Sequence, residues 1–397
     1  MRDARRLPRL AALALPVGGF VVLLTGCEKA EPLANDPANT VTRMQAGLDM
    51  VHPGRGPTDF GSNTPADVPT AYAMVLLAEV ERGRSSTPGE VPEPGPVAGT
   101  WLLEHADENR DGVIGWGLPI AWDAYGDGSV NPADTEYAIS TGIVVHALLE
   151  WLGASDKAPR ERILSAVGQA LAPYLDRAMW SPGSMLPYSL RASDRKYDTF
   201  NSAVYLAGQM QRFSKITDDA SLAPKLQVAA DSTMRTLLAN RQVTPDGNAW
   251  YWNYSIQELS PNDLAHAGFI IDGVNAYMAS GGQLSSRFER AKAVANLLQF
   301  LESGGAVVRA WPRSKGGTNA PARLVDLGVA LHITCKEPTL AALRGALLTQ
   351  VQGHVGGDGH YMKYPQSSGL PNLAVSEYEA YLFRGLATCA AAAVPAK

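Results

Sequence analysis

Several common signals are scarce in this chain of 397 residues, and their scarcity narrows what the protein can do. The seven histidines show no zinc-ligand spacing, and no glycine-rich phosphate loop precedes a helix. After residue 24, no apolar run is long enough to cross a bilayer. The formal net charge of -5 argues against nucleic acid as a partner. Strand-like alternation is also rare, which favours an all-α protein.

The first 27 residues have the pattern of a targeting signal. An arginine-rich start precedes an apolar stretch, 10–24, that is too short for a comfortable membrane span. The stretch ends in Leu-Thr-Gly-Cys at Cys27, which resembles the lipobox of bacterial lipoprotein signals. The resemblance implies lipidation of Cys27 and a membrane-anchored protein in the periplasm or at the cell surface, with the outer membrane favoured. An uncleaved anchor is the other reading. Residues 28–63, rich in Pro, Asn and Gly, are expected to be a tether and entry segment.

A helix-start pattern recurs about every 60 residues along the remaining chain, 64–393. Its clear forms are Thr-Pro-Ala-Asp at Thr64, Asn-Pro-Ala-Asp at Asn131 and Ser-Pro-Asn-Asp at Ser260. Each offers a capping side chain, a proline at the first helical position and an acid in the first turn. We therefore expect the helix after Ser260 to begin at Pro261. Apolar helices alternate with amphipathic ones, which predicts an (α/α)6-type toroid of about six helical hairpins.

The loops that enter the predicted inner helices are long and aromatic, so we place the chemistry at that end of the ring. Flat rings around a central hollow suit the apolar faces of sugars. The alternative is that the rings close the barrel end as core. The recurring aromatics are Trp122, Tyr188, Trp252, Trp311 and Tyr364.

The stretch 250–273, WYWNYSIQELSPNDLAHAGFIIDG, combines such aromatics with Asn-Asp-x-x-His at a helix start. It resembles the helical C-terminal domain of glucuronyl C5-epimerases and, more distantly, toroidal polysaccharide lyases. The resemblance in helical organisation covers roughly 64–391, and it implies that Tyr254 and His266 remove the proton beside a uronic carboxylate. Reprotonation would then give epimerisation, whereas β-elimination would give chain cleavage.

The residues support related roles without the resemblance. His266 lies near a helix start, whose positive end disfavours a protonated ring and keeps the imidazole available as a base. Glu136 is the candidate carboxylate for acid or base chemistry. A structural histidine is the alternative for His266, and Asp134 and Asp263 are expected to cap helices first.

Further contacts to the substrate are expected from aromatic and polar residues on the same loops. Basic residues on these loops would hold the carboxylate of an acidic polysaccharide or oligosaccharide. A glycoside hydrolase that uses Glu136 with Glu377, or a non-catalytic glycan-binding lipoprotein, remains an alternative. The proposed contacts are Trp122, Tyr137, Tyr188, Tyr197, Asn201, Trp250, Trp252, Asn262, Trp311, Arg313, Tyr361, Tyr364, Glu377 and Tyr378.

Two smaller features complete the analysis. Asp107-x-Asn109-x-Asp111-Gly resembles the first half of a calcium loop, but Leu118 stands where the bidentate Glu belongs. The loop is therefore a possible calcium site or an Asx-rich turn that holds itself together, and no other cofactor is required. Cys335 and Cys389 lie near the ends of two neighbouring inner helices, where they form either a disulfide or two buried thiols.

Overall fold

The computed structural model describes residues 36–60, 64–87, 89–258, 260, 262–310 and 320–394. The predicted signal and Cys27 lie outside these residues, as do Trp311 and Arg313. In the part that is described, helices dominate and the strands are only two residues long. None of the described helices is both long and apolar enough to cross a membrane.

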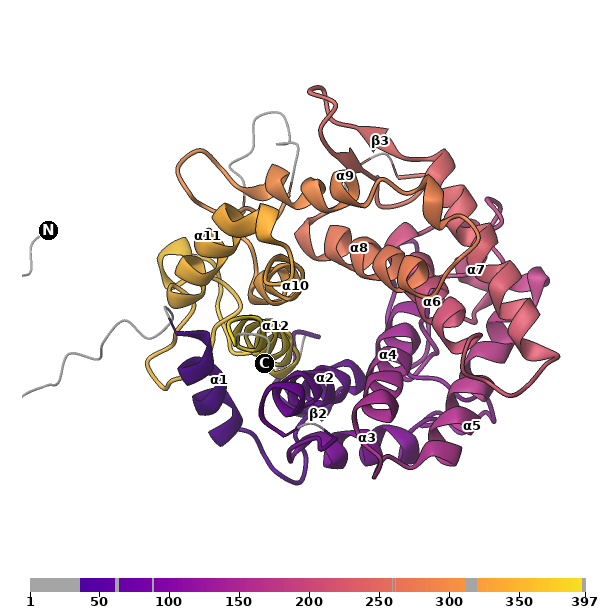
Figure 1. Cartoon of the computed structure of the whole chain (residues 1–397), viewed down its shortest axis with the longest axis horizontal. Helices are drawn as coiled ribbons and strands as arrows, with labels where there is room; N and C mark the ends of the chain where they lie inside the picture. Colours follow the sequence, from indigo (N-terminus) through magenta and orange to yellow (C-terminus); the bar gives the residue numbers. More distant parts are fainter. Residues whose placement is uncertain are drawn as a thin grey trace, which may run out of the picture. The chain divides into compact units, whose positions relative to one another are not determined.

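Within the described residues, six inner helices form a closed ring, as predicted (Figure 1). Each packs on the next, and the last packs on the first. Most are apolar nearly all round, because one face meets the outer helices and the other meets the interior of the ring. The inner helices are α2 (Pro69–Ser86), α4 (Ala138–Ala154), α6 (Phe200–Phe213), α8 (Leu264–Ala279), α10 (Leu324–Thr334) and α12 (Ser376–Ala392).

An outer helix returns along each inner one. Five of them follow their inner partners in the chain, whereas the sixth, α1, comes from the N-terminal side and packs on α12. The outer helices are α1 (Pro37–Ala46), α3 (Gly95–Glu104), α5 (Arg160–Leu171), α7 (Leu222–Ala239), α9 (Arg290–Ala295) and α11 (Ala341–Gln352). The short elements are β1 (Arg55–Gly56), β2 (Ala66–Asp67), β3 (Gln242–Val243), β4 (Trp250–Tyr251), η1 (Ala172–Leu175), η2 (Arg177–Met179), η3 (Ala192–Lys196), η4 (Ser285–Arg287), η5 (Asn296–Phe300), η6 (Pro338–Leu340) and η7 (Gln366–Ser368).

Helix α1 lies within residues 28–63, the stretch expected to be a tether and entry segment. Asp36 caps α1 by accepting hydrogen bonds from the backbone N–H groups of Ala38 and Asn39. Val41, only 3% exposed, anchors the helix in the core. The sixth hairpin is therefore formed by α1 and α12, which lie far apart in the sequence and pack on each other.

The inner helices begin later than their sequence signals predict. Helix α8 starts at Leu264, not Pro261, and its N-cap is Asp263, whose carboxylate accepts the backbone N–H of His266 at 3.0 Å. The cause is a set of contacts between repeats, in which the first N–H of an inner helix donates to a carbonyl in the next loop. Such bonds satisfy donors that a helix start leaves unpaired. They run from Ala138 to Tyr188, Phe200 to Tyr254, Leu264 to Arg309, Leu324 to Lys363 and Ser376 to Pro57.

A disulfide joins the neighbouring inner helices α10 and α12. Cys335 is the C-cap of α10, Cys389 belongs to α12, and their Cα atoms are 4.9 Å apart. The sequence left open whether these cysteines form a disulfide or two buried thiols, and in the structure they form the disulfide.

Candidate functional site

We call the end of the ring at the first residues of the inner helices the entry rim, and the end at their last residues the exit rim. At the entry rim, His266 lies in the first turn of α8 with its Nδ1 atom 2.8 Å from Oδ1 of Asp263. The carboxylate holds a proton on Nδ1, which leaves Nε2 for chemistry. The His266 side chain is 29% exposed, so it is accessible from this end.

Tyr254 completes this group. The edge of one ring meets the face of the other, with the centroids of Tyr254 and His266 5.2 Å apart. The tyrosine is fixed by its backbone, because its N–H donates to the carbonyl of Ser260 at 2.9 Å and its carbonyl accepts from Phe200 at 3.1 Å. Burial raises the pKa of Tyr254 well above its usual value, so the phenol stays protonated. Tyr254 is therefore suited to donate a proton, and His266 to accept one.

Two arginines lie beside the carboxylate of Asp263. Arg323 and Arg309 approach its second oxygen at 3.2 and 3.3 Å. Burial alone would raise the pKa of Asp263, but the charge that His266 carries when protonated, its hydrogen bond and the charge of Arg323 outweigh burial and hold the pKa well below its usual range. Arg323 is also bound by Asp326, with atoms 2.8 Å apart, whereas Arg309 is 37% exposed. Of the two, Arg309 is the one that can reach a ligand.

A cluster of tyrosines lies beside this group on the entry rim. Tyr125 stacks on Tyr197 with centroids 3.7 Å apart and lies 5.2 Å from Tyr188. Its hydroxyl contacts Thr199 at 2.9 Å. Tyr188 and Tyr197 were predicted, but Tyr125 was missed. Asp123 is the sequence feature that could have indicated Tyr125. Its carboxylate accepts hydrogen bonds from the backbone N–H groups of Tyr125, Asp127 and Gly128, and these bonds fold the loop that carries the Tyr125 ring.

The last repeat supplies a third polar group. Glu377, half-buried at the start of α12, accepts a hydrogen bond from Thr70 at 2.5 Å, and burial raises its pKa. The Tyr378 hydroxyl donates to Asp59 at 3.0 Å, and Lys363 lies 2.5 Å from the same carboxylate oxygen. Glu377 and Tyr378 thus belong to the entry rim, as expected, and the contact from Asp59 was not foreseen.

Several predicted contacts are core instead. Trp252 is 1% exposed, and its indole N–H donates to the carbonyl of Leu237 at the end of α7. Trp116 makes the same contact with Leu102 of α3, so the two tryptophans are equivalent. The residue equivalent to Tyr188 is Tyr254, not Trp252. The backbone carbonyl of Tyr188 accepts the first N–H of α4, and the backbone carbonyl of Tyr254 accepts the first N–H of α6. The other predicted contacts that are buried are Tyr137, Asn201, Trp250, Asn262 and Tyr361.

Glu136 is also misplaced by the sequence argument. It is 4% exposed, and Asn109 donates to its Oε1 at 2.7 Å. The side chain packs against Gly115, where an added Cβ would lie 2.6 Å from the Glu136 Cγ. Glu136 therefore holds the loop before α4 and does not present its carboxylate as an acid or base.

The possible calcium loop forms hydrogen bonds with itself. Asp107 accepts the N–H of Gly112, Asn109 that of Asp111, and Asp111 that of Val113. No group of three His, Cys, Asp or Glu side chains within the described residues is arranged to hold a metal ion. These hydrogen bonds form the Asx-rich turn that was the alternative to a calcium site at this loop.

Trp122 and Tyr364 remain at the surface of the loops. Trp122 is 37% exposed, with the ring of Phe60 at 6.3 Å. Tyr364 is half-buried, and the ammonium group of Lys363 lies 5.3 Å from its ring centroid. Trp311 and Arg313 fall in 311–319, outside the described residues.

No protein-family model and no curated protein sequence matches this chain. Solved structures do match its fold. A sugar epimerase from a ruminal bacterium has a TM-score of 0.58 at 13% identity, covering 90% of this chain and 97% of that one. A GH76 α-mannanase from Bacteroides thetaiotaomicron has a TM-score of 0.60 at 12% identity, covering 91% and 97%. An unsaturated glucuronyl hydrolase specific for heparin has a TM-score of 0.56 at 8% identity, covering 90% and 95%. The chain therefore has the (α/α) toroid fold of carbohydrate-processing enzymes.

Proposed function

We propose that the chain is a carbohydrate-active enzyme that acts on an acidic, uronate-containing polysaccharide by proton transfer at the entry rim. The observation that carries the proposal is the contact of His266 with Asp263 on one side and Tyr254 on the other. A base oriented by a carboxylate, next to a neutral phenol, is the arrangement that proton abstraction and return require.

Each residue has a distinct role in this reaction. Nε2 of His266 removes the proton from the carbon beside the uronate carboxylate, and Asp263 stabilises the imidazolium that forms. Arg309 pairs with the substrate carboxylate, on which negative charge develops. Tyr254 then donates its proton, either to the same carbon from the other face, which gives an epimer, or to the leaving oxygen, which gives an unsaturated product.

The test measures the ultraviolet absorbance of unsaturated uronates while protein lacking residues 1–27 is incubated with a panel of acidic polysaccharides. His266→Ala and Tyr254→Phe should each lower the rate by about a hundred- to ten-thousand-fold, the usual contribution of a positioned acid or base. His360→Ala is the matched control, because His360 is 58% exposed and pairs with Glu379 instead. Epimerisation is tested in parallel by deuterium uptake from heavy water. If no polysaccharide gives a rise in absorbance or an uptake of deuterium, the proposal is refuted.

Glycoside hydrolysis is the second candidate, and Glu377 is the observation that favours it. A half-buried carboxyl whose pKa is raised by burial is suited to protonate a leaving group. Release of reducing ends without a rise in absorbance, lost in Glu377→Gln, would select this reaction. We further propose that residues 1–27 direct the protein to lipid attachment at Cys27, which would place the enzyme at a bacterial membrane surface.

A further inference from the structure

A cavity opens at the exit rim, the end of the ring opposite the residues of the proposed reaction. Its volume is about 790 Å³, and its walls come from α4, α6, α8, α10, the first residue of α9 and the residues that follow α8 and α10. A smaller adjoining space adds α2 and α12, so that all six inner helices contribute. Small-molecule sites typically measure about 300–1,000 Å³, and this cavity falls within that range.

Aromatic rings separate the cavity from the entry rim. Phe269 lies 6.3 Å from His266 on one side and 5.9 Å from Tyr205 on the other, measured between ring centroids. Tyr381 adds a third ring 6.0 Å from Phe269. The Tyr205 hydroxyl reaches His146, which lines the cavity. The two ends of the ring are therefore distinct sites.

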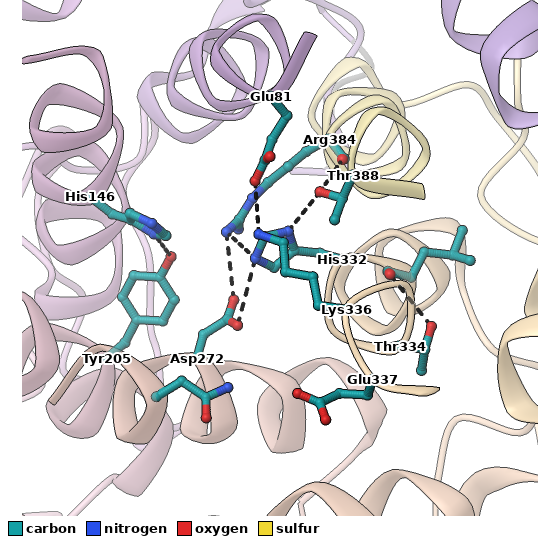
Figure 2. A network of polar contacts seen from close by, with 12 residues as sticks. Glu81, His146, Tyr205, Asp272, His332, Thr334, Lys336, Glu337, Arg384 and Thr388 are labelled. Carbon is teal, nitrogen blue, oxygen red and sulfur yellow. Dashed lines mark hydrogen bonds and ion pairs between the residues drawn. The ribbon is translucent and has the colours of Figure 1, made fainter. Parts of the chain in front are cut away.

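Two buried polar side chains have incomplete hydrogen bonding where the cavity meets the smaller adjoining space: Asp272, which lines the cavity, and Arg384, which lines the adjoining space. Figure 2 shows the Asp272 carboxylate pointing from α8 towards Arg384 and His332. Asp272 lies 3.7 Å from Arg384 and 3.8 Å from His332, too far for good hydrogen bonds. The side chains of Asp272 and Arg384 are only 9% and 3% exposed. Among the described residues, neither Oδ2 of Asp272 nor Nε of Arg384 has a hydrogen-bond partner.

This gap is unexpected for a purely structural network, because buried polar atoms are normally hydrogen-bonded. Cations at the ends of inner helices have a simple explanation, since they offset the negative end of the helix dipole. Asp272 and Arg384 lie in the middle of α8 and α12, where the dipole gives them no such role. A ligand that both accepts and donates hydrogen bonds would complete them.

Charges around the mouth are already paired. The acidic and basic side chains form close ion pairs across neighbouring helices, so little net charge is presented to a ligand. These pairs are Lys336 with Glu81, Arg212 with Glu150, and Arg290 with Glu337.

Both histidines in the cavity are neutral. Burial lowers the pKa of His146 to about 4, and it lowers the pKa of His332 well below its usual value. Arg384 can only donate, so Nε2 of His332, 2.8 Å away, must accept, and Nδ1 of His332 donates to Thr388 at 2.9 Å. His332 is thereby fixed in one tautomer. Its Nε2 atom holds the Arg384 guanidinium in place and is not free to act as a base.

We propose that this cavity is a second binding site, for a neutral polyhydroxylated molecule of monosaccharide or disaccharide size. One ligand hydroxyl donates to Asp272 and accepts from Arg384, thereby filling the gap between them. Ala276, Met278 and Ile333 give the cavity an apolar wall for the face of a ring. The proposal does not depend on the reaction at the entry rim.

The test is ligand-observed saturation-transfer NMR followed by calorimetry on protein lacking residues 1–27. Glucose, galactose, myo-inositol and cellobiose serve as neutral probes, and galacturonate, inorganic phosphate and alanine as charged ones. At least one neutral probe should bind. Asp272→Asn should weaken its binding by about tenfold to a hundredfold, as expected when a hydrogen bond to a charged group is lost. Ala276→Phe should abolish binding by filling the cavity without altering its ion pairs.

Asp156→Asn is the matched control, because Asp156 is exposed in the loop after α4 and does not line the cavity. This variant should bind the probe like the unmodified protein. Circular dichroism checks that each variant is folded. If the Asp272→Asn variant is not folded, the binding result for Ala276→Phe alone tests the proposal. Failure of every neutral probe, binding of charged probes alone, or unchanged binding in Ala276→Phe would overturn the proposal.

Discussion

Glu79, in the middle of α2, provides a quantitative test of the packing of the inner ring. It is completely buried, and its Oε2 atom contacts the guanidinium of Arg82. Its other oxygen has no hydrogen-bond partner within the described part of the chain. Burial raises the pKa of Glu79 from 4.5 to about 7, and the charge of Arg82 only partly opposes this. The fold therefore prefers the protonated carboxyl.

The sign of the pH dependence follows from this shift. The stabilisation from the raised pKa is fully present below the pKa of the unfolded chain, 4.5, and is lost as the pH rises through about 7. At about 1.4 kcal/mol per pH unit, the full loss is about 3 kcal/mol. Glu79→Gln removes the titration while keeping the shape of the protonated side chain. The free energy of unfolding of the variant, relative to the unmodified protein, should rise by about 3 kcal/mol from pH 4 to pH 8.

The assay is urea unfolding followed by tryptophan fluorescence across this pH range. Glu90→Gln is the matched control, because Glu90 is 55% exposed and pairs with Lys157 at the surface. Its effect should stay small at every pH. A difference between Glu79→Gln and the unmodified protein that does not change with pH would show that burial of Glu79 does not control its protonation.

Two further predictions concern the cysteines. The disulfide between Cys335 and Cys389 spans 54 residues, for which the chain-entropy relation gives about 4 kcal/mol. Replacing both cysteines by serine should lower the free energy of unfolding by up to that amount, and two alkylatable thiols in unreduced, unfolded protein would contradict the bond. Cys27→Ala should prevent incorporation of an alkyne-labelled fatty acid in bacteria and move the protein to the soluble fraction, whereas absence of label on the unmodified protein would refute lipidation.

The fold was predictable from the sequence because its signals are local. Proline and a capping side chain precede several inner helices, and most inner helices are apolar nearly all round. The errors arose where contacts between repeats override the local signal. Helix α8 begins three residues beyond Pro261, since Leu264 bonds to the loop of the next repeat. Helix α1 was missed because its role depends on α12, at the far end of the chain.

The site was predictable only in part, for the same reason. His266 and Tyr254 were identified because their stretch resembles part of an epimerase domain and because His266 lies near a helix start, and the structure places their rings in contact. Trp252 and Tyr254 are both aromatic residues in the same loop before α8, so the sequence does not distinguish them. Only the carbonyl of Leu237 at the end of an outer helix, which binds the indole N–H, assigns Trp252 to the core. The gap between Asp272 and Arg384 joins residues from α8 and α12, so no local pattern could indicate it.

The sequence by itself determined a ring of helices and the end of the ring at which polar and aromatic loops gather, because helix caps and apolar periodicity act over a few residues. Only the tertiary structure decided which side chains are exposed at each end. That choice depends on hydrogen bonds between repeats and on which helices become neighbours when the ring closes. It also created the exit-rim cavity, which requires the inner helices to surround one axis.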